Sequence, residues 1–184
     1  MRVLGLSGSL RRDSHNTALL HAAGRLLPAE AELVVFEGLG DLPPFDQDVE
    51  DAGAPLAVAR LREAIAGADV LLVATPEYNH SIPGVLKNAL DWASRPRRTS
   101  VMRGKTVAAV GASTGMFGAV WAQADLRRVL GATGARVVDA GLGVPGAAEA
   151  FGPEGDLADP ALAAELGALV EALVAETRVP AAAA

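Results

Sequence analysis

Side chains that could bind an anion crowd one short segment near the N-terminus. Residues 7–17 read SGSLRRDSHNT and follow an apolar run at residues 3–6. The candidates carry hydroxyl, amide or guanidinium groups: Ser9, Arg11, Ser14, Asn16 and Thr17. The backbone N–H groups at the start of a helix also favour an anion. The segment therefore predicts a site for a phosphate monoester, and the alternative is a polar loop that contains a good helix cap.

Two common phosphate motifs are absent from this segment. The pattern GxxxxGK[ST] does not occur, which excludes the P-loop nucleotide hydrolases. The pattern GxGxxG is also missing, because Gly5 is followed by Leu6, Ser7 and Gly8. Any phosphate site here must therefore be built in another way.

A second polar segment follows the apolar run at residues 70–74. It contains the only tyrosine of the chain, Tyr78, next to Glu77 and Asn79, and Pro76 and Pro83 stiffen it at its two ends. Such a rigid loop can offer backbone groups to the edge of a flat heterocycle. The alternative for Tyr78 is a half-buried packing role.

A third segment, GASTG at residues 111–115, matches the GxSxG pattern of the α/β-hydrolases. That fold places its catalytic histidine after the serine in the chain. All three histidines, His15, His21 and His80, precede Ser113. We therefore reject a hydrolase.

The elements that must position these loops alternate along the chain. Strands are expected at residues 3–6, 33–36, 70–74, 107–110 and 137–142, because each run is apolar on both faces. Helices are expected at residues 16–27, 56–66, 83–94, 117–130 and 160–176. This alternation predicts an α/β fold, a flavodoxin-like three-layer sandwich with a five-stranded parallel sheet in the order 2-1-3-4-5. Ligands of such a sheet bind at the carboxyl ends of the strands.

Length and composition limit the function classes. The 184 residues fit a single domain, which we expect at residues 1–179 with a frayed tail at 180–184. The chain has no cysteine, which excludes disulfides, thiolate metal sites and cysteine nucleophiles. No histidine-based metal motif is present, so we expect no metal. The net charge of −6 argues against nucleic-acid binding. No apolar run is long enough for membrane insertion, and the strand-like start indicates a cytoplasmic protein.

The sequence resembles a known family at several of these positions. GSLRRDSHN at residues 8–16 is similar to the phosphate loop of the NADPH-dependent FMN reductases. PEYNHSIPGVLKNALDWASR at residues 76–95 is similar to their signature through the third loop and helix. The likeness continues through residues 111–115 and 125–127, and weakly through residues 151–159. The family includes quinone and chromate reductases and some azoreductases.

The resemblance implies non-covalent FMN. It places the phosphate on Ser9, Arg11, Ser14, Asn16 and Thr17, and the isoalloxazine ring against Pro76, Glu77, Tyr78 and Asn79, with Ser113 and Gly115 at its border. It also implies a homodimer or homotetramer, with the helix around residues 86–92 near the interface.

The function implied is an oxidoreductase that passes hydride from NADPH, or from NADH, through FMN N5. The acceptors implied are small molecules: quinones, chromate-like oxyanions, azo compounds or free flavin. The use of one face by donor and acceptor predicts ping-pong kinetics. No side chain need act as an acid or base. Glu77 is the only carboxylate expected near the ring, and its alternative role is to fix the loop. The alternatives are a non-catalytic flavin-binding electron carrier or redox sensor, and a nucleotide-binding module without flavin.

Three features have two interpretations each. Phe117, beside Gly118 and Ala119 where relatives often carry a glycine pair, caps the substrate side or packs beneath the helix. The basic cluster Arg95, Arg97, Arg98, Arg103 and Lys105 is a solvated turn or a site for the 2′-phosphate of NADPH. The acidic stretch at residues 38–55 is a solvated loop or a lip beside the site.

Overall fold

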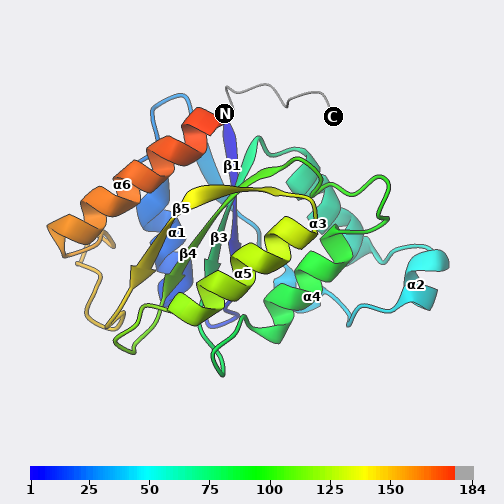
Figure 1. Ribbon diagram of the computed structural model, residues 1–184, viewed down its shortest axis with the longest axis horizontal. Helices are drawn as coiled ribbons and strands as arrows, with labels where there is room; N and C mark the ends of the chain where they lie inside the picture. Colours follow the sequence, from blue (N-terminus) through cyan, green and yellow to red (C-terminus); the bar gives the residue numbers. More distant parts are fainter. Residues whose placement is uncertain (177–184) are drawn as a thin grey trace.

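A central sheet of parallel strands forms the middle layer of the computed structural model, which describes residues 1–176. Its strands are β1 (Arg2–Ser7), β2 (Glu32–Val35), β3 (Val70–Thr75), β4 (Thr106–Ala112) and β5 (Arg136–Val144). They lie in the order β2-β1-β3-β4-β5, and all neighbouring pairs are parallel. This topology confirms the predicted flavodoxin-like sheet. The arrows in Figure 1 all point toward one edge, where the polar loops lie.

Helices cover both faces of the sheet (Figure 1). They are α1 (His15–Arg25), α2 (Gln47–Asp51), α3 (Leu56–Ala66), α4 (Gly84–Ala93), α5 (Val120–Ala132) and α6 (Pro160–Ala175), with a 3₁₀ turn at Leu39–Asp41. Buried side chains of α1 and α6 pack on one face, and those of α3, α4 and α5 pack on the other. Strands β3 and β4 are buried along their whole length because helices cover both of their faces.

Helix ends follow from local sequence in two cases and not in a third. Ser14 caps α1 by accepting a hydrogen bond from the Thr17 N–H, and Asp159 caps α6. The expected helix at residues 117–130 begins later, at Val120, because Gly118 and Ala119 both have positive φ and interrupt it. The expected tail at residues 180–184 lies outside the described residues.

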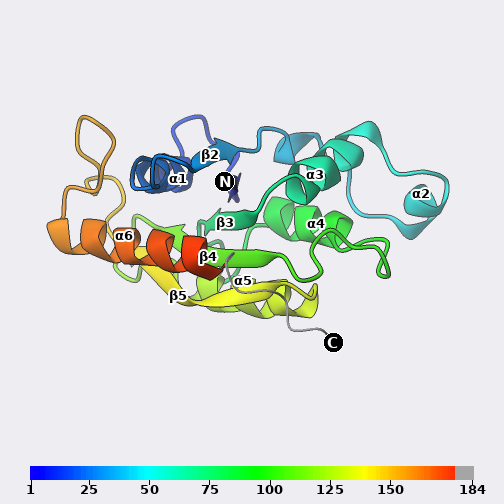
Figure 2. The ribbon, with the colours of Figure 1, turned by 90° about the horizontal axis from the view of Figure 1, so that it is seen from above.

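The acidic stretch at residues 38–55 is held against α4. Trp92, which is fully buried, donates its Nε1–H to the Pro43 carbonyl at 2.8 Å, and Asn88 donates to the same oxygen at 2.9 Å. Phe45 packs edge-to-face on Trp92. The stretch is thus anchored around Pro43 and Phe45, while its acidic residues Asp41, Asp46, Asp48 and Asp51 are exposed and the short helix α2 projects from the body (Figure 2). Leu86 and Trp92, from the helix that the resemblance places near an interface, are buried in the chain's own core.

Residues 1–176 contain neither a membrane-spanning helix nor a metal-binding cluster. None of their helices combines the length and apolar character needed to cross a membrane. Within the same residues, no three His, Asp or Glu side chains lie close enough together to hold a metal ion.

Candidate active site

Three loops meet at the carboxyl edge of the sheet, after β1, β3 and β4. They enclose a pocket of about 140 Å³. Its lining residues are Ser9, Arg11, Ser14, His15, Asn16, Pro76, Glu77, Tyr78, Ala112, Ser113 and Thr114. The structure thus brings together eight residues named from sequence: Ser9, Arg11, Ser14, Asn16, Pro76, Glu77, Tyr78 and Ser113. Thr17, Asn79 and Gly115 are not in the lining.

Asn16 fastens the loop after β1 to the end of β4. Its Nδ2 donates to the Ala112 carbonyl, and its Oδ1 accepts from the Ala112 N–H, both at 3.0 Å. The side chain is buried, so these bonds are worth about 1 kcal/mol each or more. Thr17 is partly buried, and its Oγ1 donates to Ser7 Oγ at 2.8 Å. The loop is therefore held rigidly from below.

The start of α1 provides the groups that can bind an anion. The first N–H groups of a helix have no acceptor inside it, and Ser14 Oγ takes only that of Thr17. The Arg11 side chain is exposed at the same pocket and has no ion pair within residues 1–176. This part of the pocket therefore combines helix N–H groups with one guanidinium.

The loop after β3 ends in a two-residue hairpin turn. Tyr78 and Ser81 exchange backbone hydrogen bonds of 3.0 and 3.1 Å, and Asn79 and His80 between them have φ values of 53° and 60°. Positive φ at both central residues is the type I′ pattern. Asn79 is therefore exposed at the tip of the turn, whereas Tyr78 is half exposed at the pocket.

Glu77 is directed at α5. Its Oε2 accepts the backbone N–H of Trp121 at 3.0 Å and that of Ala122 at 3.1 Å. Ala119, the residue before α5, has no side chain that could cap the helix. Glu77 supplies that cap from another loop, which stabilises the contact by about 0.5–2 kcal/mol. The Glu77 carboxylate, which was expected near the ring, therefore holds the start of α5 in place.

A second carboxylate ties the same loop to α5. Ser81 Oγ donates to Asp125 Oδ2 at 2.6 Å, and Arg128 donates to Asp125 Oδ1 at 3.0 Å. The hydrogen bond from Ser81, followed by that from Arg128, lowers the pKa of the Asp125 carboxyl from its ordinary value. Loop and helix are therefore joined at two points.

The loop after β4 packs closely on β5. Ser113 Oγ accepts from the Gly115 N–H at 3.2 Å, and Gly118 has a φ of 55°. A Cβ on Gly118 would lie 2.7 Å from the Gly143 carbonyl carbon, so a side chain cannot fit. Phe117 is 59% exposed, which contradicts the interpretation that it packs beneath the helix.

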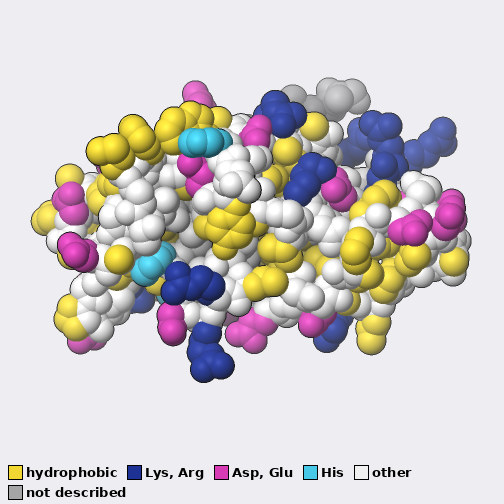
Figure 3. Space-filling model, turned by 90° about the horizontal axis from the view of Figure 1, so that it is seen from below, with side chains coloured by type: hydrophobic (Ala, Val, Ile, Leu, Met, Phe, Trp, Pro, Cys, Tyr) yellow, Lys and Arg dark blue, Asp and Glu magenta, His cyan; other side chains and the backbone are white. Residues whose placement is uncertain are grey.

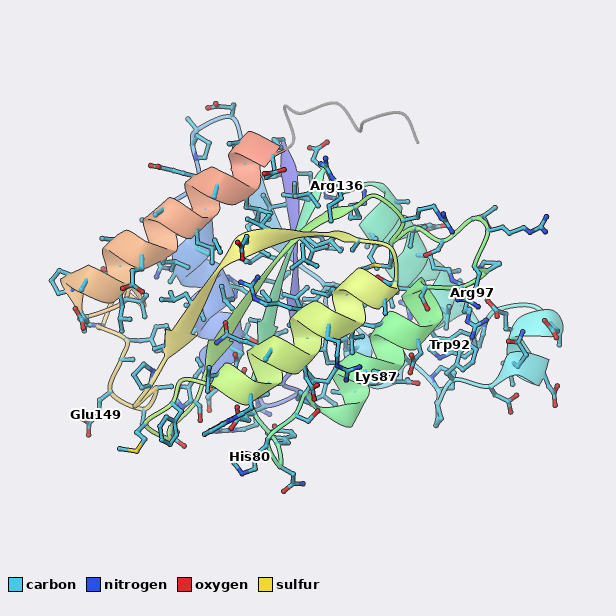
Figure 4. All side chains as sticks on the ribbon, in the orientation of Figure 1. His80, Lys87, Trp92, Arg97, Arg136 and Glu149 are labelled. Carbon is cyan, nitrogen blue, oxygen red and sulfur yellow. The ribbon has the colours of Figure 1, made fainter. Side chains whose placement is uncertain are left out.

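The basic cluster lies in a different place from the pocket. Lys87, Arg95, Arg97, Arg103 and Arg128 line a groove of about 480 Å³ between α4 and α5. The groove shares no lining residue with the pocket at the carboxyl edge. Figure 4 shows Arg97 at the right-hand side of the molecule and His80 at its lower edge. Arg98 and Lys105 do not line the groove.

The comparisons with known proteins decide the family. The family model for NADPH-dependent FMN reductase matches residues 1–149. The chain belongs to this family. An NAD(P)H-dependent FMN reductase of Pseudomonas aeruginosa is 48% identical over 130 residues, which cover 71% of this chain and 69% of that protein. A 2-hydroxy-1,4-benzoquinone reductase of a Burkholderia species is 47% identical over 129 residues, or 70% of this chain and 69% of that protein.

A solved structure supports the assignment over almost the full length. FerB, a flavoenzyme NAD(P)H:(acceptor) oxidoreductase from Paracoccus denitrificans, has a TM-score of 0.87 and 37% identity, and the match covers 96% of each chain. Family membership confirms the sequence-based expectation of an enzyme that uses FMN with NAD(P)H as the electron donor.

The types of residue that line the pocket of this FMN reductase suit FMN. The helix N–H groups and Arg11 suit a phosphate, and the loop of Pro76 and Tyr78 offers backbone beside it. A pocket of 140 Å³ encloses only part of a molecule as large as FMN, because sites that enclose ligands of that class span about 300–1,000 Å³. Part of the flavin would therefore lie outside this pocket.

Sequence reasoning missed three residues of the lining: His15, Ala112 and Thr114. His15 follows the cap directly, and Thr114 lies inside the GASTG segment, so position alone could have indicated both. Ala112 carries no polar side chain. Its contribution is the backbone bond to Asn16, which only the fold reveals.

Proposed function

We propose that this chain oxidises NAD(P)H and reduces quinone-type acceptors by hydride transfer through FMN N5 in two alternating half-reactions. The observation that carries the proposal is the pocket where the loops after β1, β3 and β4 meet. Relatives named quinone reductase, such as that of Escherichia coli at 38% identity, support the acceptor class. Chromate-like oxyanions, azo compounds and free flavin belong to the same proposal as further acceptors.

The overall reaction balances without a protein nucleophile. NAD(P)H and one proton give two electrons and two protons to the quinone, which becomes a hydroquinone while NAD(P)⁺ leaves. Bound FMN supplies the centre that takes the hydride from one reactant and passes the electrons to the next. Because both reactants need the same open side, they bind in turn, which predicts ping-pong kinetics.

In this proposal the chain's own groups bind FMN and orient it. We propose that the phosphate lies on Ser9, Arg11, Ser14 and the first N–H groups of α1, with Asn16 and Thr17 holding this loop in place. We propose that Pro76, Glu77, Tyr78 and Asn79 border the ring mainly through backbone. Because the Glu77 carboxylate accepts two hydrogen bonds from α5, it has no role as a general base in this proposal. The homodimer or homotetramer and the cytoplasmic location stay predictions.

An anaerobic spectral titration tests the function. We expect the purified protein to carry FMN, to lose the flavin colour when NADPH is added, and to regain it when 1,4-benzoquinone follows. Initial rates measured against NADPH concentration, at several fixed quinone concentrations, should give parallel double-reciprocal lines. Retention of FMN without bleaching by NADPH or NADH would favour the electron carrier. Failure to bind FMN would contradict the proposal altogether, and intersecting lines would contradict the ping-pong order.

A further inference from the structure

Four large hydrophobic side chains are exposed just after the last pocket residue, Thr114, along the chain. Met116, Phe117, Val120 and Trp121 follow the GASTG loop, and each is more than 40% exposed. Figure 3 looks onto the carboxyl edge of the sheet and shows hydrophobic side chains gathered along part of it. Contiguous apolar groups at a surface mark a place where something binds. Glu77, which lines the pocket and accepts the Trp121 N–H, links this group to the pocket, and this link points to a ligand of that pocket.

The aromatic members of this group are arranged in an ordered way. The Phe117 and Trp121 rings meet edge-to-face, with centroids 5.0 Å apart and planes at 69°. The His80 ring meets Trp121 in the same manner at 4.8 Å. Such packing holds the rings in fixed orientations while their outer surfaces remain exposed. We call Phe117 and Trp121 the aromatic shelf.

Glu77 fixes the aromatic shelf relative to the loop after β3, which is proposed to border the flavin ring. Its Oε2 accepts the backbone N–H of Trp121 itself, at 3.0 Å, and Glu77 also lines the pocket. Its Oε1 lies 3.6 Å from His80 Nδ1, on the ring that packs against Trp121. One side chain thus connects the loop expected beside the ring with the first turn of α5.

We infer that the aromatic shelf determines acceptor specificity, by stacking on flat aromatic acceptors at the open side of the site, and that Glu77 is the positioning residue that holds the shelf there. This inference rests on the proposed function. A planar quinone gains ring contact with Phe117 and Trp121 on entering. A metal complex such as ferricyanide has no flat ring and gains none. The shelf therefore favours the first over the second.

The test compares two acceptors in FMN-loaded enzyme. Phe117→Ala and Trp121→Ala should each lower the ratio of kcat/KM for 1,4-naphthoquinone to kcat/KM for ferricyanide by about tenfold, the size expected for a lost aromatic contact. Leu56→Ala is the matched control. Leu56 is also an exposed hydrophobic residue, on α3, and lies outside the pocket lining, so the ratio should not change.

Variants of Glu77 separate positioning from proton transfer. Glu77→Ala should lower the acceptor ratio as the shelf variants do. Glu77→Gln should restore most of it, because the amide oxygen still accepts from the N–H groups of α5. A proton-transfer role would instead leave Glu77→Gln as impaired as Glu77→Ala and would change the pH profile of kcat, and this result would overturn the positioning role.

Outcomes for the shelf are equally distinct. Equal losses with both acceptors, or an unchanged ratio in both shelf variants, would overturn the specificity role. Failure of the proposed function gives a different result, because the unmodified protein would then not be bleached by NADPH at all.

Discussion

At the scale of single residues, polar side chains in the site mostly bind to the protein itself. Asn16 bonds to Ala112, Glu77 to the first turn of α5, and Ser81 to Asp125. Sequence reasoning treated Asn16 as a group that faces a ligand, and for Glu77 it left open a place near the ring or a role in fixing the loop. Residue type and position do not reveal a partner distant in the chain. The site is therefore preorganised by these bonds, and the cofactor meets backbone and a few side chains.

Ser81→Ala tests one of these bonds through pH. Without the hydroxyl, the pKa of Asp125 should rise toward its ordinary value while Arg128 still keeps it somewhat lowered. A carboxyl whose pKa is lower in the folded state stabilises the fold above its unfolded pKa, about 3.9, and loses this effect as the pH falls through the folded pKa. The variant should therefore be less stable than the unmodified protein at pH 7, and the difference should shrink below about pH 3.9.

Urea unfolding between pH 7 and pH 3, together with a carbon NMR titration of Asp125, measures both effects. Ser94→Ala is the control, because Ser94 donates to a backbone carbonyl at 2.9 Å and not to a carboxylate. Its cost should be independent of pH. A Ser81→Ala cost that is also constant with pH would contradict the link to Asp125.

At the scale of elements, close packing of the loop after β4 on β5 depends on Gly118. Gly118→Ala adds a strained φ, worth about 1–2 kcal/mol, and a Cβ at 2.7 Å from Gly143. Gly146→Ala adds the same strain, at φ 54°, but its Cβ meets nothing within 4 Å. We expect unfolding free energies lowered by about 1–2 kcal/mol for Gly146→Ala and by at least about 1 kcal/mol more for Gly118→Ala.

Thermal and urea unfolding of the two variants measure this difference. Equal losses would show that backbone strain alone matters and that the loop can move away from β5. Displacement of this loop would also disturb the aromatic shelf, because Phe117 directly precedes Gly118.

The elements that the sequence predicted well have strong local signals. The five apolar runs became the five strands, and the helix at residues 56–66 has its expected bounds. Helix α2 was missed because it is a short acidic segment with no buried face. The start of α5 was misplaced because Gly118 and Ala119 have positive φ, and because the cap, Glu77, lies 43 residues before Val120 in another loop. Long-range contacts of this kind leave no local pattern.

At the scale of the whole molecule, positive charge is concentrated although the chain has a net charge of −6. The groove between α4 and α5 collects Lys87, Arg95, Arg97, Arg103 and Arg128, and Asp91 is its only acidic lining residue. A path of contacts joins it to the loop after β3: Arg128 bonds to Asp125, and Asp125 accepts from Ser81.

The interpretation of the basic cluster as the 2′-phosphate site of NADPH stays a prediction. Some residues of the cluster line the groove and others do not, so the two groups can be compared. Arg97 lines the groove and has no ion pair within residues 1–176, whereas its neighbour Arg98 does not line it. Arg97→Ala should raise KM for NADPH by roughly tenfold, the loss expected for one charge-assisted hydrogen bond, and KM for NADH by less than about twofold. Arg98→Ala should change neither, because its charge is similarly exposed but lies outside the groove. Steady-state kinetics measure the four KM values, one for each variant with each coenzyme. Equal increases for NADPH and NADH in Arg97→Ala would show that the groove does not distinguish the 2′-phosphate.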